Sequence, residues 1–191
     1  MISPPSLKES EFIRFTIGGP VNNAHGEVVE LSAENPEELI ENLAEYLNHL
    51  QGVERWFCPA VLKDNYRKDA NWRSAQIAAA DIDYHDEDGK HCNLPKELRG
   101  KIKECSSRLP GQLMYHTPRG FRIIYVFNHF VDDRDQMLRI LEEIQQDVAD
   151  ALLNLGLEGL RVDPVTKRLT QLMFAPRATV KGHERLETVN V

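Results

Sequence analysis

The 191-residue sequence predicts an α+β protein in which a mainly antiparallel sheet is packed by two long helices. Two pairs of strand-like segments, 11–17 with 26–31 and 111–117 with 121–127, are each joined by turn-forming residues, which is typical of β-hairpins. Two further segments, 34–52 and 132–156, repeat apolar residues at the spacing of an amphipathic helix.

Both long helices have recognisable ends. Asn35 is placed to cap the first, with Pro36 in its first turn. Asp132 or Asp133 is placed to cap the second, and Gly156 ends it. The buried stripes are expected to consist of Leu39, Leu43, Leu47 and Leu50 in the first helix, and of Leu141, Ile144, Val148, Leu152 and Leu155 in the second.

The remaining elements are shorter. We expect a strand at 55–62, a helix at 95–109 that Pro95 opens, and a last strand at 170–176. Segment 75–83 is apolar on both faces until its end, which is typical of a strand in the middle of a sheet.

The composition indicates a cytoplasmic protein that does not span a membrane. Hydrophobic residues make up 41% and charged residues 28% of the chain, as in ordinary globular proteins. No apolar run approaches the roughly 20 residues of a membrane span, and the first residues resemble no secretion signal. The three cysteines form no C-x-x-C pair, which favours reduced thiols.

The charge is unevenly distributed. The net charge of −7 argues against a protein that coats nucleic acid by bulk electrostatics. Residues 161–185 nevertheless carry a local balance of +4, so the rest of the chain carries −11. This basic segment is either a solvated surface or a local binding patch beside an acidic site.

The segment "AADIDYHDEDGKHCN" (79–93) contains the first candidate site. Asp81 and Asp83 end the apolar strand and point to the same face, because side chains alternate along a strand. Two adjacent carboxylates repel each other unless a proton or a cation lies between them. They therefore form either the solvated end of a strand or ligands for Mg²⁺ or Mn²⁺.

Two other metal sites are weaker candidates. An EF-hand is excluded, since its first ligand position would fall on Tyr84 and its bidentate glutamate on Pro95. A zinc site would draw on His85, His91, Cys92 and Cys105, whose spacing matches no standard pattern.

Two later segments carry basic residues beside turns. The turn between the strands at 111–127 contains Thr117, Arg119 and Gly120, with Arg122 just after it. Such a turn either binds a triphosphate through its N–H groups and arginines or is an ordinary basic hairpin. The segment "RVDPVTKRLTQLMFAPR" (161–177) places Asp163 before a turn, where it is either a turn starter or a third acid.

The order of these three segments resembles the archaeo-eukaryotic primase superfamily, and most closely the primase–polymerase domains of plasmids, phages and other mobile elements. The resembling features are an acid-x-acid strand end, a strand–turn–strand, and a single Asp followed by R-x-x-x-x-x-F-x-P. The segment "NYRKDANWRSAQIAAADID" (65–83) resembles the approach to the first motif. The resemblance covers about residues 55–178.

The resemblance implies an RRM-like palm joined to a small second α/β lobe. It implies one catalytic domain over 1–191, with an N-terminal lobe at 1–54, a core at 55–178 and a tail or linker at 179–191. The implied catalytic and metal-binding residues, for two Mg²⁺ or Mn²⁺ ions, are Asp81, Asp83 and Asp163. The implied nucleotide-binding residues are Thr117, Arg119, Gly120, Arg122, Arg168 and Arg177.

One position departs from the family pattern. Arg122 stands where the family usually has a histidine, two residues after the turn glycine. Arginine binds phosphate bidentately, but it does not exchange protons at neutral pH.

The sequence thus leaves three hypotheses open. The first is a DNA primase/polymerase that transfers nucleotides from dNTPs or NTPs to a 3′-hydroxyl on a single-stranded DNA template. It would act in replication of a plasmid, phage or mobile element, with a helicase fused or in trans, and without a membrane partner. The second is a catalytically impaired replication-initiation or DNA-docking module, and the third is a D-x-D sugar-nucleotide transferase.

Overall fold

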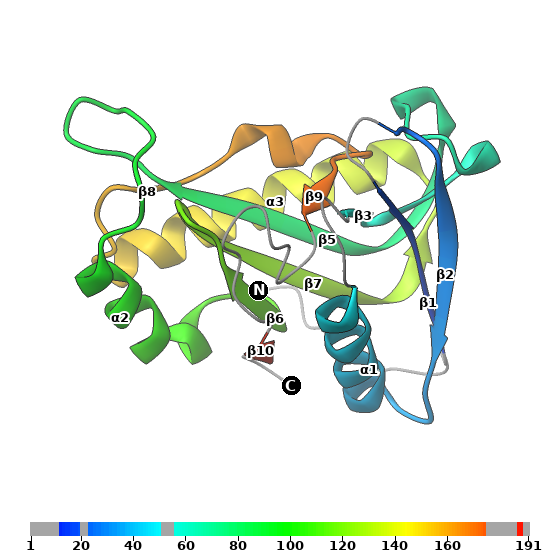
Figure 1. Cartoon of the computed structure of the whole chain (residues 1–191), viewed down its shortest axis with the longest axis horizontal. Helices are drawn as coiled ribbons and strands as arrows, with labels where there is room; N and C mark the ends of the chain where they lie inside the picture. Colours follow the sequence, from blue (N-terminus) through cyan, green and yellow to red (C-terminus); the bar gives the residue numbers. More distant parts are fainter. Residues whose placement is uncertain (1–11, 20–22, 51–55, 175–186, 189–191) are drawn as a thin grey trace.

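The residues that the structure describes form two antiparallel sheets and three α-helices (Figure 1). The structure is a computed structural model that describes residues 12–19, 23–50, 56–174 and 187–188. All strand pairings within these ranges are antiparallel. The predicted α+β class is therefore confirmed. None of the described helices has the length and apolar character needed to cross a lipid bilayer.

The smaller sheet has the strand order β2-β1-β3-β9. Its strands are β1 (Phe12–Gly18), β2 (Gly26–Ser32), β3 (Trp56–Cys58) and β9 (Met173–Phe174). The predicted first hairpin is confirmed, since β1 and β2 pair along their whole length. The last predicted strand is shorter than expected within the described residues, and 175–176 lie outside them.

The larger sheet has the order β10-β6-β7-β5-β4, and β8 also pairs with β5. Its strands are β4 (Ala60–Leu62), β5 (Trp72–Tyr84), β6 (Leu113–His116), β7 (Gly120–Val131), β8 (Leu160–Val162) and β10 (Glu187–Thr188). The central position predicted for β5 is confirmed. The sequence did not predict β8, and it assigned β10 to the tail.

One predicted strand, 55–62, is divided between the two sheets. Pro59 separates β3 from β4, and proline has no N–H to give to a strand ladder. The Thr16 hydroxyl donates to the carbonyl oxygen of Ala60 at 2.7 Å, which joins β1 to the start of β4. The chain therefore passes directly from one sheet to the other.

The two long helices form as predicted. They are α1 (Pro36–His49) and α3 (Arg134–Asn154), and the Asn35 and Asp133 side chains accept the capping hydrogen bonds from Glu38 N and Gln136 N. The third helix, α2 (Lys96–Glu104), ends earlier than predicted. Four 3₁₀ turns are η1 (Lys63–Asn65), η2 (Asp69–Asn71), η3 (Ser106–Arg108) and η4 (Pro164–Lys167).

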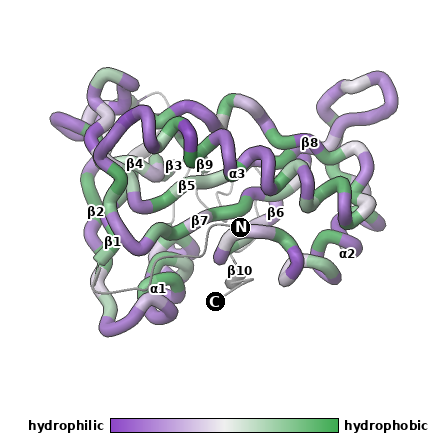
Figure 2. Tube along the Cα trace, turned by 180° about the vertical axis from the view of Figure 1, so that it is seen from behind, coloured by the Kyte–Doolittle hydropathy of each residue, from purple (hydrophilic) through white to green (hydrophobic). Residues whose placement is uncertain are grey.

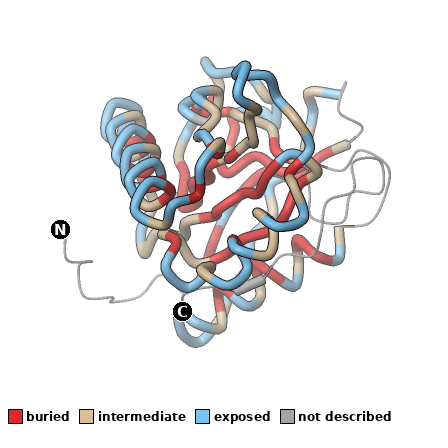
Figure 3. Tube along the Cα trace, turned by 90° about the vertical axis from the view of Figure 1, so that its left-hand side faces the viewer, coloured by how far each residue is buried: buried red, intermediate tan, exposed pale blue. Residues whose placement is uncertain are grey.

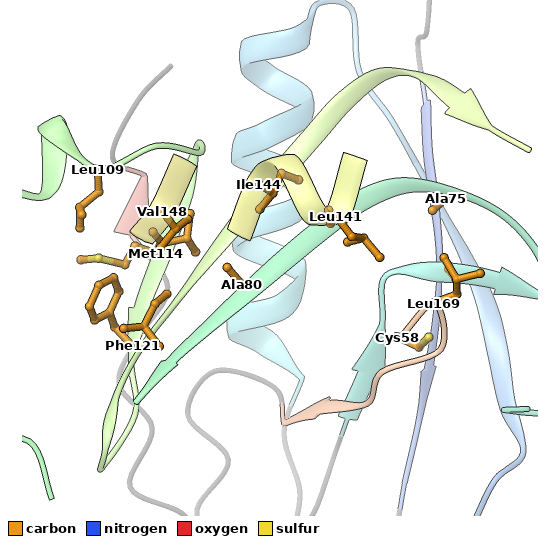
Figure 4. Packing of buried hydrophobic residues seen from close by; sticks show 14 of the residues in the cluster. Cys58, Ala75, Ala80, Leu109, Met114, Phe121, Leu141, Ile144, Val148 and Leu169 are labelled. Carbon is orange, nitrogen blue, oxygen red and sulfur yellow. The ribbon is translucent and has the colours of Figure 1, made fainter. Parts of the chain in front are cut away.

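The larger sheet has a hydrophobic core on each face. Helix α3 crosses over β5 and β7 on one face (Figure 2), where Leu141, Ile144 and Val148 gather near Ala80 (Figure 4). On the other face, Ile77 and Ala79 of β5 belong to a core that also contains residues of α1 and β1. Figure 3 shows the buried residues concentrated in the strands between these layers.

Candidate functional site

Asp81 and Asp83 lie near the end of β5, on the face opposite α3. They share this face with Ile77 and Ala79, whereas Ile82 between them is fully buried in the core beneath α3. Both acids are half-buried. The structure thus places the two carboxylates on one face, as the strand periodicity predicted.

Asp163 lies beside Asp81 although the two are far apart in the sequence. Strand β8 pairs with β5 through Val162 and Ile82, and one step further the Asp163 N–H donates to the carbonyl oxygen of Asp81 at 2.8 Å. Pro164 then ends β8, and the Asp163 Oδ1 atom caps η4 by accepting from Val165 N at 2.8 Å. The short strand β8 therefore brings the third acid to the first two.

The electrostatics of Asp83 show that the three carboxylates are close enough to interact. Burial raises the pKa of Asp83 above its ordinary value, and the nearby charges of Asp81 and Asp163 raise it further. His91 and Arg119 act in the opposite direction. A cation placed among these carboxylates would relieve this repulsion.

Arg122 is held by partners inside the protein. Its Nη2 atom donates to Asp81 Oδ2 at 2.7 Å, and its Nη1 atom donates to the Tyr115 hydroxyl at 3.0 Å and to the Phe174 carbonyl oxygen at 3.2 Å. The residue is only 9% exposed. The sequence placed Arg122 at the nucleotide phosphates, whereas here its guanidinium lies against the first acid.

The predicted phosphate-binding turn is a tight hairpin. Thr117 is buried, and its N–H and hydroxyl both bond to backbone groups of Gly120. Pro118 has no N–H, so the turn offers fewer donors than the sequence suggested. Arg119 is exposed and lies near enough to Asp83 to affect its pKa, which makes Arg119 the turn residue best placed for a phosphate.

His91 is a neighbour of the acids that the sequence analysis did not assign to them. Its Nδ1 atom lies 3.4 Å from Asp83 Oδ2, and its ring lies 4.2 Å, between centroids, from the ring of His85. The isolated bridge that pairs His85 with His91 sets this position. A sequence signal for it was the pair of histidines on either side of the Gly89 turn.

The zinc hypothesis gains no support from the structure. The Cys92 thiol donates to Asp86 Oδ2, and the Cys105 thiol donates to the carbonyl oxygen of Ile102. Within the described ranges, no group of three or more histidine, cysteine, aspartate or glutamate side chains has an arrangement ready to hold a metal.

The acids nevertheless have the chemistry of a site for a hard cation. Their donors are carboxylate oxygens, which suit Mg²⁺ or Mn²⁺. Asp81 Oδ1 is buried and has no hydrogen-bond partner among the described residues. Asp81 Oδ2 and Asp163 Oδ1, in contrast, already accept bonds from Arg122 and Val165. The acids therefore offer the donor chemistry that a hard cation needs, although among the described residues they are not already arranged as a three-ligand site.

The last two predicted nucleotide-binding residues lie further along the chain. Arg168 is exposed and ends η4. Arg177 lies outside the described residues. The structure therefore brings together the three acids, Arg119 and Arg122, and it does not show a contact of Arg168 with them.

A groove of about 600 Å³ lies between α3 and β8. Gln145 lines it and donates to the carbonyl oxygen of Asp163 at 3.4 Å, so the groove borders the third acid. Its lining also contains Arg161 and Lys167, with Glu142 3.9 Å from Lys167. The mixture of charges does not mark this groove as a phosphate site.

Comparisons with protein-family models, with curated proteins and with solved structures found no match to the chain.

Proposed function

We propose that the protein is a metal-dependent nucleotidyltransferase of the primase/polymerase kind. It transfers nucleotides from dNTPs or NTPs to a 3′-hydroxyl on a single-stranded DNA template. The observation that carries the proposal is the meeting of Asp81, Asp83 and Asp163 at one end of the larger sheet. If the three acids were only the solvated ends of strands and turns, there would be no reason for side chains from two separate motifs to lie together.

The proposed roles follow from the chemistry of the groups. The three acids would hold Mg²⁺ or Mn²⁺, which when bound would lower the pKa of the attacking hydroxyl and neutralise negative charge on the phosphate oxygens. Arg119, exposed beside Asp83, binds the phosphates of the incoming nucleotide. Positioning and charge neutralisation account for most of the catalysis in phosphoryl transfer.

An incorporation assay tests this proposal. Labelled dNTPs and NTPs are offered on primed and unprimed single-stranded DNA with Mg²⁺ or Mn²⁺. We expect activity in the wild type and a loss of at least about a hundredfold in Asp83→Asn, since a group that steadies charge in the transition state is removed. Asp86→Asn, on the adjacent exposed loop, is the matched control and should keep activity. Equal activity in the wild type and Asp83→Asn would contradict the proposal.

A second function has one observation in its favour. The bond from Arg122 to Asp81 neutralises one of the acids, as expected of a primase-like replication-initiation or DNA-docking module that has lost chemistry. Calorimetry with Mn²⁺ and a nucleoside triphosphate separates the two. Metal-dependent binding favours the enzyme, and DNA binding without it favours the docking module.

The wider role is part of the same proposal. The domain would act in replication of a plasmid, phage or mobile element, together with a helicase that is fused to it or recruited in trans. An RRM-like palm over the larger sheet and a small second lobe around α1, β1 and β2 would fit this role.

A further inference from the structure

Arg122 is the centre of a buried network that links four strands, β5, β6, β7 and β9. It pairs with Asp81 across β5 and β7 and with Tyr115 across β7 and β6. The Tyr115 hydroxyl accepts from Arg122 and donates to the Phe174 carbonyl oxygen at 2.8 Å, so it closes the network on β9. Each terminal nitrogen of the guanidinium therefore has a protein partner.

The network keeps Arg122 charged and in place. A guanidinium keeps its proton at any physiological pH, and Asp81 Oδ2 lies 2.7 Å from the Nη2 atom of Arg122. Burial raises the pKa of Tyr115 to about 12, so its hydroxyl stays protonated. A buried guanidinium that lost its carboxylate would be left uncompensated, which is costly. Arg122 is thus unsuited to leave Asp81 in exchange for a mobile ligand.

A guanidinium in this place changes how many metal ions the acids can hold. Two divalent ions about 4 Å apart are commonly bridged by one carboxylate that gives an oxygen to each ion. Here Arg122 takes Asp81 Oδ2, and the guanidinium groups of Arg122 and Arg119 already offset part of the carboxylate charge. The oxygen count and the charge both fit one ion better than two.

We propose, on the basis of the function proposed above, that Arg122 is a built-in cation that replaces one of the two metal ions. It neutralises Asp81 from within the fold, and the site binds a single divalent ion that depends on Asp83. In this role Arg122 is a positioning residue that holds the Asp81 carboxylate and does not bind the triphosphate.

A purely structural role predicts a different result. If Arg122 only ties β5, β6 and β9 together, its removal destabilises the fold and leaves the number of bound ions unchanged. If Arg122 replaces an ion, its removal leaves Asp81 Oδ2 without a donor and the Asp81 carboxylate without a neutralising charge, and a second ion binds there. The number of ions therefore separates the two roles, independently of activity.

The test counts Mn²⁺ in the full chain with a non-hydrolysable dNTP analogue. Crystals of the wild type are expected to show one anomalous manganese peak at Asp83, with Arg122 still bonded to Asp81. Arg122→Gln, which keeps an amide donor for Tyr115, should show two peaks and bind its second Mn²⁺ at least tenfold more tightly than the wild type. Arg122→Lys, which keeps the charge, is the matched control and should show one peak.

The outcomes distinguish this inference from the proposed function. Two peaks in the wild type would overturn the inference and leave a two-metal enzyme. No peak in the wild type would overturn both. One peak in a folded Arg122→Gln protein would assign Arg122 a structural role only. If Arg122→Gln does not melt cooperatively, the wild-type count and the position of Arg122 in that crystal decide the question.

Discussion

Gly120 shows at the scale of one residue why the hairpin turn lies against the acids. It pairs with Asp83, and a Cβ atom at this position would lie 1.8 Å from the carbonyl oxygen of Ile82. No L side chain fits so close to a backbone atom of β5. The absence of a side chain at Gly120 is therefore what allows the Arg119 turn to close over the end of β5.

Gly120→Ala should destabilise the protein strongly. Overpacking typically costs about 1–3 kcal/mol, and we expect the upper end of this range because the obstacle is backbone. Gly100→Ala is the control: Gly100 lies in α2 with nothing within 4 Å of its missing Cβ, so alanine should stabilise by up to about 1 kcal/mol. Urea unfolding measures both, and equal stabilities would contradict the packing argument.

Asp83 should make stability depend on pH with an unusual sign. Its folded pKa is raised, so the folded protein holds the proton to higher pH than the unfolded chain. The ordinary pKa of an aspartate is 3.8. As pH rises from this value through the raised folded pKa, ionisation of Asp83 makes the folded state less stable, and the protein stays destabilised at all higher pH. Asp83→Asn should raise Tm at neutral pH in metal-free buffer, and this gain should disappear below the ordinary pKa.

Asp86 is the matched comparison for Asp83, because its effect on the pH dependence of stability has the opposite sign. Hydrogen bonds from the Lys90 N–H and the Cys92 thiol lower the pKa of its carboxyl. Asp86 therefore stabilises the folded protein at pH values above its ordinary pKa of 3.8, and this stabilisation is lost as pH falls through the lowered folded pKa. Asp86→Asn should thus lower Tm at neutral pH. Thermal melts from pH 2 to 8 test the pair, and Tm shifts of the same sign at neutral pH would contradict one of the two assignments.

The sequence located the acids better than it located their partners. Asp81 and Asp83 were predictable because strand alternation alone puts them on one face. The bond between Asp81 and Arg122 depends on the register of β5 against β7, which are separated in the chain by α2 and β6. No local pattern specifies that register, so Arg122 looked like an exposed phosphate ligand.

At the scale of elements, the helices were predictable and the shortest strands were not. The apolar spacing and the caps located α1 and α3. Strand β8 has only three residues, too few to show alternation, and it forms because β5 offers an edge beside it. The division of 55–62 at Pro59 also depends on two sheets being present, which no local pattern in this segment reveals.

The cap of α3 gives a test at this scale. Asp133 accepts a hydrogen bond from Gln136 N at 2.7 Å, and loss of such a cap costs about 1 kcal/mol. Asp133→Ala should lower the free energy of unfolding by this amount. Asp132→Ala, at the neighbouring exposed position, is the control and should change it by less than about 0.5 kcal/mol. Chemical denaturation measures both, and equal losses would contradict the assigned cap.

For the whole molecule, the α+β class followed from the turn residues and the apolar periodicity, whereas the layer arrangement did not. The faces of β5 alternate between two cores, one under α3 and one that includes residues of α1 and β1. Apolar residues on both faces predicted that β5 would be central. They did not indicate which helix covers which face, because this depends on the order of strands in the sheets.

The network around Arg122 also connects the acids to an optical probe. Phe174, whose carbonyl oxygen binds Arg122, is the partner in β9 of Trp56 in β3, and Trp56 is fully buried. The protein has one other tryptophan, Trp72. With Trp72 replaced by phenylalanine, Trp56 would be the single tryptophan. Its fluorescence emission would then report changes in the hydrogen bonds that connect the carboxylates to Phe174, without any attached dye.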